Sequence, residues 1–357
     1  MKVKFFLSAL LLSSLLLAAL SFSKTTAYAR PIPTSGGARN TSLIELNLSN
    51  SYIVLGLSAQ DVLGRPTGTI SDFAAAMENI AGTDVIIFPA NYFHTSGSGR
   101  ANQIIGGVFS NGDIIYLGYF DWGAGFSRDN RFSFFECIHS QTDIVTAFNT
   151  YPHLIQYGIR HYPIPYHNQS FLNRRTSRAF MGQRLDGTFV IGNVSGANMR
   201  EVQDIAAYLN LFNATNIDGG GSTGLWRNGS YITRPARQLP SVVYITNNRI
   251  NVNLNGGPFE MNAHAIMLGG IPMVPLSAGA EALGLDLIGS SVITADDQII
   301  PFGAFSRIIG GHNLVPLQRL VEAIDGTFMW MPDIRTAFIT IEITDLDEQD
   351  SQQYLQH

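Results

Sequence analysis

Residues 213–224 read NATNIDGGGSTG, a stretch in which a short predicted strand ends at Asp218 and glycines and hydroxyl residues follow. A glycine run lets backbone N–H groups approach an anion because no Cβ stands in the way. A carboxylate at a strand end can act as a base, a nucleophile or an orienting group. Asp218 is therefore a candidate catalytic residue. The candidate substrate-binding residues beside it are Gly219, Gly220, Gly221, Ser222 and Thr223.

The same glycines also fit the GxGxxG spacing of dinucleotide-binding loops. That loop needs a helix directly after it, so that the helix N-terminus faces the pyrophosphate. Residues 225–233 instead read LWRNGSYIT, which predicts a β-hairpin with its turn at Asn228 and Gly229. Nucleotide binding is therefore not expected, and a loop without function is the remaining alternative when this stretch is taken alone.

The chain around this loop is predicted to be rich in strands. It has 35 glycines, 15 prolines and 11% aromatic residues, which favours strands and tight turns. A helix is predicted after Asn198, where Glu201 completes a capping box and apolar residues recur at helical spacing up to Phe212. A second helix is predicted at 71–80 with Ser71 as its cap. The predicted strands are Leu43–Leu48, Asp84–Phe88, Asp113–Leu117, Thr188–Gly192 and Ser241–Thr246.

Further motifs surround the glycine loop in a fixed order: TSRAFMG at 176–182, DGTFVIG at 186–192, NVSGANMRE at 193–201 and RPAR at 234–237. In this order and spacing, the chain resembles the phosphodiester glycosidase family over about residues 40–248, most strongly from 174 to 246. The resemblance implies a mixed-sheet α+β domain and hydrolysis of a sugar-1-phosphodiester, of the N-acetylglucosamine type. It also implies a role on exopolysaccharide, capsule or cell-wall material.

The resemblance assigns roles to individual residues. Arg178 is expected to be catalytic together with Asp218, and Arg237 to bind substrate, since guanidinium forks match phosphate oxygens. A salt bridge from Arg178 to Asp218 that ties two strands is the alternative. Asn91 and His94 are candidate substrate-binding residues, although a packed, hydrogen-bonded role for His94 is also open.

The sequence departs from the family pattern in three places. The family's Asn-Gly-Gly-Phe-Phe is PANYF at 89–93, its late Asn is Ser241, and its Val-Asp-Gly is VSG at 194–196. Glycosidases generally use two carboxylates, and only Glu136 and Asp121 are candidates for the second. A noncatalytic, envelope-associated carbohydrate-binding or structural protein that keeps the fold is therefore the alternative function.

An internal repeat follows residue 248. GIPMVPLSAGAEAL at 270–283 aligns with GHNLVPLQRLVEAI at 311–324 at an offset of 41. Each copy predicts a strand ending in Val-Pro-Leu, a short helix and a hairpin strand. Residues 249–343 resemble the copper amine oxidase N-terminal-like repeat domain, which implies a small noncatalytic α+β module at the surface or cell wall, without copper. Residues 344–357 are predicted to be a flexible acidic tail.

The N-terminus is predicted to be a secretory signal peptide. Lys2 and Lys4 precede an apolar run, and TTAYA at 25–29 offers cleavage after Ala29. An uncleaved membrane anchor is the alternative. Residues 30–40 are predicted to be a linker before a domain spanning 41–248. A secreted or cell-surface bacterial protein, with no membrane contact after cleavage, is therefore expected.

Composition excludes several classes of function. The formal charge is −5, so nucleic acid is not an expected partner. The three lysines all lie before residue 25, which excludes a catalytic or phosphate-binding lysine. The spacing of His153, His161 and His167 lacks the i, i+4 pattern of a helical zinc pair, so neither a metal nor a cofactor is expected. The expected partners are a glycan or sugar-phosphate polymer and, through residues 249–343, the cell wall.

Overall fold

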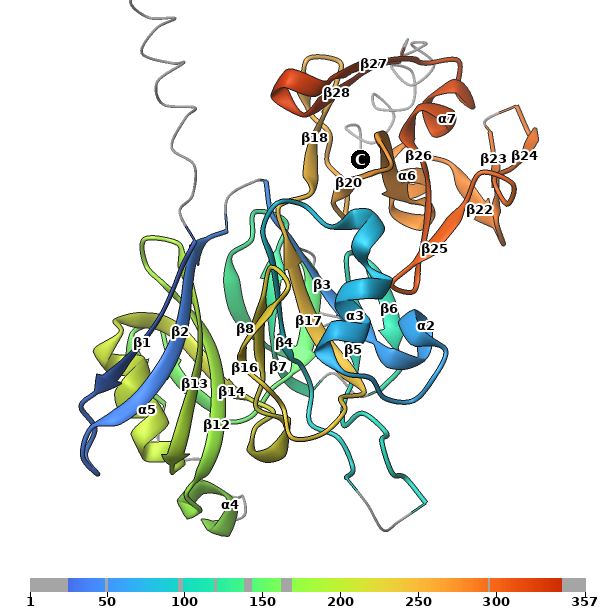
Figure 1. The fold of residues 1–357 in the computed structure, drawn as a ribbon. Helices are drawn as coiled ribbons and strands as arrows, with labels where there is room; N and C mark the ends of the chain where they lie inside the picture. Colours follow the sequence, from blue (N-terminus) through green and yellow to red (C-terminus); the bar gives the residue numbers. More distant parts are fainter. Residues whose placement is uncertain are drawn as a thin grey trace, which may run out of the picture. The chain divides into compact units, whose positions relative to one another are not determined.

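The computed structural model describes residues 25–48, 51–95, 99–118, 121–137, 143–161, 169–294 and 296–341. The chain forms two compact units, each built from two separate segments (Figure 1). The first unit comprises the described parts of Met1–Ser49 and Tyr151–Thr223. The second comprises those of Asn50–Thr150 and Gly224–His357.

The first unit is a seven-stranded antiparallel sheet in the order β1-β2-β13-β12-β14-β10-β11. In Figure 1 the blue strands β1 and β2 continue the sheet of the green strands β13 and β12. Its strands are β1 (Thr26–Ile32), β2 (Arg39–Asn47), β10 (His153–Gln156), β11 (Ile159–Arg160), β12 (Thr176–Arg184), β13 (Thr188–Ala197) and β14 (Leu211–Ile217). Its helices are α4 (Gln169–Asn173), α5 (Met199–Tyr208) and the 3-10 turn η3 (Gly220–Ser222).

Helix α5 covers one face of this sheet. Val202, Ile205 and Ala206 of the helix pack in one core cluster with the sheet residues Leu43 and Phe180. Position 192 in β13 must stay without a side chain, because a Cβ there would lie 2.2 Å from the Phe180 ring. Because Val202, Ile205 and Ala206 of α5 are buried in this cluster, the apolar spacing in the sequence marks the face of the helix that packs on the sheet.

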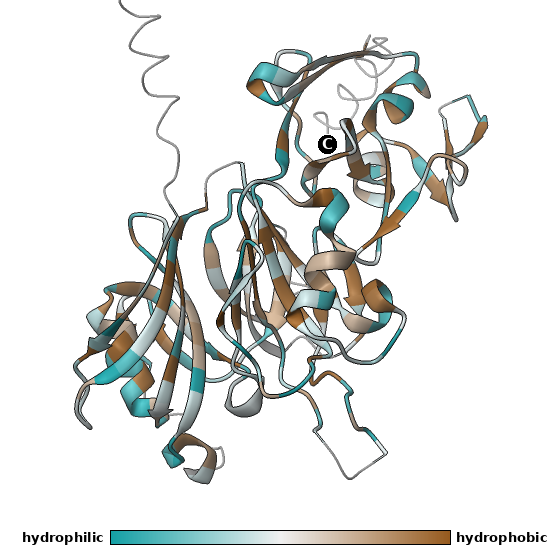
Figure 2. Cartoon of the chain, in the orientation of Figure 1, coloured by the Kyte–Doolittle hydropathy of each residue, from teal (hydrophilic) through white to brown (hydrophobic). Residues whose placement is uncertain are grey.

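The second unit contains two five-stranded sheets, in the orders β16-β15-β4-β17-β3 and β6-β5-β9-β7-β8. They pack against each other where Gly56 of β3 meets Val108 of β5 and Phe148 of β9. The strands β3, β4 and β17 are buried along their whole length, and Figure 2 shows them mainly in the hydrophobic colour. The strands of these sheets are β3 (Ile53–Ser58), β4 (Val85–Pro89), β5 (Val108–Ser110), β6 (Asp113–Tyr116), β7 (Asp121–Ser127), β8 (Phe132–Cys137), β9 (Ile144–Asn149), β15 (Leu225–Arg227), β16 (Ser230–Thr233) and β17 (Ser241–Thr246).

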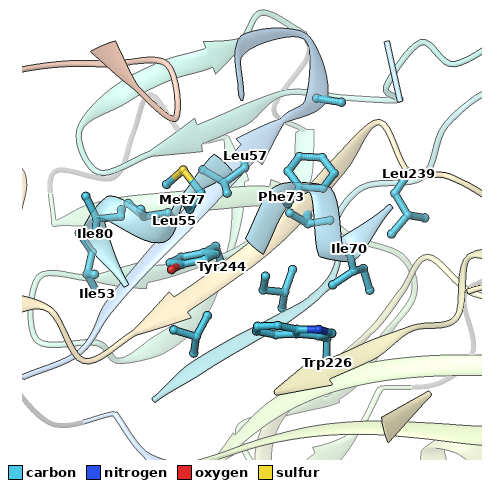
Figure 3. Packing of buried hydrophobic residues seen from close by; sticks show 14 of the residues in the cluster. Ile53, Leu55, Leu57, Ile70, Phe73, Met77, Ile80, Trp226, Leu239 and Tyr244 are labelled. Carbon is cyan, nitrogen blue, oxygen red and sulfur yellow. The ribbon is translucent and has the colours of Figure 1, made fainter. Parts of the chain in front are cut away.

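Short helices cover the other face of the β4–β17–β3 sheet. They are α2 (Ala59–Leu63), α3 (Ile70–Ala76) and the 3-10 turn η1 (Glu78–Ile80). Figure 3 shows Phe73 of α3 and Met77 lying over Leu57 and Tyr244 of the sheet. The same cluster includes three residues of the C-terminal part of the chain, namely Ile266, Met273 and Leu314. These three residues share a core with the preceding sheets, whereas most buried residues between 250 and 339 form a cluster of their own, which includes Val274 and Val315. A separate repeat domain stays a prediction.

The C-terminal strands form a sheet in the order β25-β26-β21-β20-β18-β28-β27 and a three-stranded sheet β22-β23-β24. Both copies of the repeat form a strand followed directly by a helix, and the two strands pair with Val274 opposite Val315. The elements are β18 (Arg249–Leu254), β19 (Gly257–Pro258), β20 (Ala265–Leu268), β21 (Ile271–Pro275), α6 (Leu276–Ala282), β22 (Asp286–Ile288), β23 (Ser291–Ile293), β24 (Ile299–Pro301), β25 (Arg307–Ile309), β26 (His312–Pro316), α7 (Leu317–Glu322), β27 (Thr327–Met331), η4 (Pro332–Ile334) and β28 (Thr336–Thr340).

The structure confirms the predominance of sheets over helices and corrects three local predictions. Residues 30–40 are not a linker, because 30–32 belong to β1 and pair with residues 39–41 of β2. Helix α3 begins earlier than predicted, with Thr69 rather than Ser71 as its cap. Helix α5 has the predicted Asn198 cap but ends at Tyr208, so Phe212 lies in β14 instead. In the part of the chain that the structure describes, no helix has the length and apolar character to span a bilayer.

Candidate functional site

Arg178 and Asp218 lie on neighbouring strands of the first unit. Ala179 of β12 pairs with Ile217 of β14, so Arg178 and Asp218 are the next positions on the two strands. Both are buried, with 3% and 8% of their surface exposed. The sheet register therefore brings together two candidates that are 40 residues apart in sequence.

The glycine loop turns directly after Asp218 and packs on the start of β12. A Cβ at Gly219 would lie 3.0 Å from the Ser177 carbonyl oxygen, so only glycine fits without a shift of the backbone. Gly220 has a φ of +59°, in the left-handed region that favours glycine. The sequence TNIDGGGST therefore serves two geometric needs: a close strand contact and a tight turn.

Most amides of this loop are already used within it. The Gly219 N–H donates to Asp218 Oδ1 at 2.9 Å, which fixes the orientation of the carboxylate. The Ser222 N–H donates to the Gly219 carbonyl at 3.1 Å, and the Thr223 N–H to the Gly220 carbonyl at 3.3 Å. Between Gly219 and Thr223, the amides that make no hydrogen bond to the described residues are those of Gly220 and Gly221. A ligand anion would therefore meet two backbone donors rather than a full nest of them.

Arg178 is held by α4 as well as by its strand. Its Nη2 donates to the carbonyls of Phe171 at 2.6 Å and Arg174 at 2.9 Å. Its guanidinium also lies over the Phe171 ring, 4.7 Å from the centroid. Tyr151 stands next to Phe171, with ring centroids 6.3 Å apart, and burial raises the pKa of the Tyr151 hydroxyl. Arg178 thus has a structural task at the end of α4, and two of its five N–H groups are committed to it.

The remaining candidates belong to the second unit. Asn91 follows β4 and is 1% exposed; its Nδ2 donates to the Gly107 carbonyl at 2.9 Å, and its buried Oδ1 accepts no hydrogen bond from the described residues. His94 is half-buried and pairs through its backbone with Asn102 and Gln103. Ser241, where the family pattern has Asn, is buried in β17.

The second unit contains a cavity of about 390 Å³ beside β18 and a cavity of about 370 Å³ that contains Arg237. This smaller cavity is lined by Thr67, Phe93, Thr95, Asn102, Arg237 and Gln238. Phe93 and Thr95 flank His94, so the structure brings Arg237 to the segment that carries Asn91 and His94. Arg237 itself is exposed and can reach a ligand in this cavity. The sequence analysis missed Thr67 and Gln238, because no motif marks them.

A Ser–His–Asp arrangement occurs elsewhere in the second unit and was not predicted. His312 of β26 places Nδ1 3.1 Å from Asp113 Oδ2 and Nε2 3.1 Å from Ser110 Oγ. Ser110 is fully buried, and its Oγ accepts the Gly56 N–H at 2.9 Å. Because a nucleophile must meet its substrate, this arrangement is a link between strands and not a catalytic triad.

Other candidates are only partly described. The side chains of Glu136 and Asp121 lie outside the described part of the structure, as does His167. His153 and His161 are in the first unit, with ring centroids 6.1 Å apart. The Asn228-Gly229 hairpin is present as β15 and β16, so a strand and not a helix follows Gly224. The dinucleotide fingerprint therefore lacks the helix that it requires.

Two solved structures of low sequence identity are similar to parts of this chain. A hypothetical protein from Synechocystis superimposes with a TM-score of 0.53 and 14% identity, over 62% of this chain and 62% of that chain. This chain thus spans 62% of the length of that protein. The catalytic domain of zebrafish N-acetylglucosamine-1-phosphodiester alpha-N-acetylglucosaminidase, auto-inhibited by its pro-peptide, gives a TM-score of 0.49 and 18% identity, over 62% of this chain and 83% of that chain.

A family model matches part of the chain. Residues 82–246 match the model of the phosphodiester glycosidase family. The predicted resemblance to this family is therefore confirmed over that segment, whereas the resemblance of residues 249–343 to a copper amine oxidase N-terminal-like domain stays a prediction. No curated protein matches the chain.

Proposed function

We propose that this protein is a hydrolase that cleaves a sugar-1-phosphodiester linkage. The observation that carries the proposal is the family match over residues 82–246, because it contains every candidate site residue named from the sequence. Within the first unit, an oriented Asp218 carboxylate and a glycine turn with two available amides support it. We further propose an N-acetylglucosamine-type substrate in exopolysaccharide, capsule or cell-wall material, and export of the protein to meet it.

The proposed reaction breaks the bond between the anomeric carbon and the phosphate oxygen. In one route, water attacks the anomeric carbon, the bonding pair leaves with the phosphate, and the proton of the water passes to Asp218. In the other route, the Asp218 carboxylate displaces the phosphate and forms a glycosyl ester. Water then attacks the anomeric carbon, the ester bond breaks, and the freed carboxylate takes the proton. A phosphate monoester is a better leaving group than a sugar alkoxide. Weak acid assistance is therefore sufficient, and the second carboxylate of ordinary glycosidases is not required.

Specific contacts follow from the positions of the other residues. Within the second unit, Arg237 would pair with an oxyanion that enters its own cavity, because an exposed guanidinium is suited to oxyanions. The amides of Gly220 and Gly221 would bind a sugar or phosphate oxygen. The Asp218 carboxylate keeps its orientation through the Gly219 N–H, which reduces the reorganisation needed during the reaction.

The test is hydrolysis of a UDP-linked or p-nitrophenyl-linked N-acetylglucosamine-1-phosphodiester by the full chain and by its Asp218→Asn variant. Turnover by the parent protein, lost in the variant, is the expected result. Asp186→Asn is the matched control, because Asp186 is an exposed aspartate of the same unit and asparagine can still accept the Thr188 N–H. Equal turnover by parent and Asp218→Asn would refute the role of Asp218.

A noncatalytic carbohydrate-binding function is the second candidate. It is favoured by the use of two Arg178 N–H groups on the carbonyls of Phe171 and Arg174. In that case the glycan would bind without release of sugar, and Asp218→Asn would leave the bound fraction unchanged. Equilibrium binding measured beside turnover, with the same proteins, separates the two functions.

A further inference from the structure

The cavity of about 390 Å³ in the second unit lies against β18, away from every residue assigned above. Its volume falls in the range of small-molecule sites in proteins. Strand β18 contributes Arg249, Asn251 and Asn253, which are alternate residues and therefore share one face of the strand. Asn251 pairs with Thr336 of β28, which also lines the cavity, and Phe259 adds an aromatic wall.

The guanidinium of Arg249 is fixed in place. Its Nη1 donates to the Arg128 carbonyl at 2.6 Å, and the same carbonyl lies 2.8 Å from Nε2 of His264. Burial and the charge of Arg249 lower the pKa of His264 to about 3, so the ring is neutral near pH 7. A neutral ring that bonds to a carbonyl must carry its proton on Nε2, so both groups donate to this oxygen. Arg249 is thus held before any ligand arrives.

Arg249 has no carboxylate partner among the described residues. Asp129 acts on it electrostatically, but its carboxylate binds Arg131 at 2.6 Å. Glu260 is taken by Arg128. Burial lowers the pKa of Arg249, which is the physical sign of a charge that has lost water without gaining a counter-ion.

The amides beside Arg249 are also available. In the described part of the chain, the side chains of Asn251 and Asn253 make no hydrogen bond, whereas Asn255 on the same hairpin uses both of its amide groups on Ile341. Amide groups can donate to and accept from hydroxyls. The Thr336 hydroxyl donates to the Ile334 carbonyl at 3.0 Å, so its oxygen can accept from a ligand. The cavity therefore offers one positive charge, two uncommitted amides, one hydroxyl acceptor and an apolar wall.

We propose that this cavity binds a small hydroxylated anion, a sugar phosphate or a sugar acid. The oxyanion pairs with Arg249, and the hydroxyls of the ligand bond to Asn251, Asn253 and Thr336. The site is independent of the proposed hydrolase, since it shares no residue with the Asp218 loop or the Arg237 cavity. It would give the C-terminal region a ligand of its own.

Isothermal titration of the full chain tests the proposal with glucose 6-phosphate, glucuronate, glucose and inorganic phosphate. Glucose 6-phosphate is chosen because it has no phosphate at the anomeric carbon and cannot be a substrate of the proposed hydrolase. One or both anionic sugars should bind, and the stronger of them shows whether phosphate or carboxylate is preferred. Glucose and inorganic phosphate should each bind at least about tenfold more weakly than that sugar, because each lacks one half of the recognition.

Variants locate the binding. Arg249→Gln should weaken it about tenfold or more, and Asn253→Ala about threefold to tenfold. Asn253→Ala guards against loss of folding in Arg249→Gln, because the Asn253 side chain has no structural hydrogen bond in the described chain. The matched control for Asn253→Ala is Asn47→Ala, because Asn47 is an exposed strand asparagine of the first unit. The Asp218→Asn variant should bind these ligands as tightly as the parent protein does.

Three results would overturn the proposal. The first is an absence of binding by both anionic sugars. The second is equal binding of inorganic phosphate and glucose 6-phosphate, which would mean a simple ion site. The third is full binding by a folded Asn253→Ala variant, in combination with an Arg249→Gln variant that either fails to fold or also binds the ligand fully.

Discussion

Acidification should destabilise the second unit through His264. The folded pKa of this ring is lowered to about 3, mainly by burial and then by the charge of Arg249. An unfolded histidine titrates near about 6.5. Between these values the unfolded chain binds a proton that the folded chain does not, so the free energy of unfolding falls as the pH falls. The slope approaches about 1.4 kcal/mol per pH unit, and the loss from about pH 7 to about pH 5 is about 2 kcal/mol. Because the folded pKa lies well below about pH 5, the size of this loss is set almost entirely by the pKa of the unfolded histidine.

Urea unfolding followed by tryptophan fluorescence measures this effect, because Trp122, Trp226 and Trp330 all belong to the second unit. The control is His264→Gln, whose amide can still donate to the Arg128 carbonyl but does not titrate. The parent protein should lose about 2 kcal/mol more than the variant between about pH 7 and about pH 5, while all other groups cancel in the comparison. Parallel stability curves for the two proteins would refute the reasoning.

Three further perturbations have definite expected outcomes. Glu201→Ala removes a buried carboxylate that completes the capping box of α5 and pairs with two arginines, so it should cost about 3 kcal/mol in chemical denaturation; a cost below about 1 kcal/mol would contradict this. Gly219→Ala places a Cβ 3.0 Å from the Ser177 carbonyl oxygen and should cost about 1–2 kcal/mol, measured as a lower melting temperature; an unchanged temperature would show that the strand yields freely. His312→Ala leaves the Ser110 hydroxyl without its ring partner and should cost about 1–3 kcal/mol, seen as faster amide exchange in β5 and β26; unchanged exchange would argue against a structural link.

Local patterns predicted individual elements of both units. The capping box at Asn198 and Glu201 and the apolar spacing after it gave α5, because these signals depend only on neighbours within one or two turns. The Asn-Gly turn at 228–229 gave the β15–β16 hairpin for the same reason. The end of α5 was missed by four residues, since Leu209–Phe212 continue the apolar spacing while Leu211 and Phe212 enter β14. The hairpin at 30–40 was missed because Pro, Gly and Ser in that stretch are equally typical of a linker.

Some residues of the candidate site could be recognised from local sequence patterns, and the contacts of others could not. Asp218 and its glycine turn were recognisable because strand end, glycines and hydroxyls are adjacent in the sequence. The commitment of Arg178 to the carbonyls of Phe171 and Arg174 was not, because it depends on where α4 packs against β12.

The sequence by itself determined the strand-rich composition, the repeat around Val274 and Val315, the loop after Asp218 and the resemblance of residues 82–246 to the phosphodiester glycosidase family. Only the tertiary structure decided that Ser110 meets His312 and that Arg249 shares a carbonyl with His264. The partners in these contacts are separated by as many as about 200 residues, and their distance is set by strand register and sheet packing. Local residue patterns carry no information on that distance, because a polar side chain looks the same in sequence whether its partner is water or a buried group from the other end of the chain.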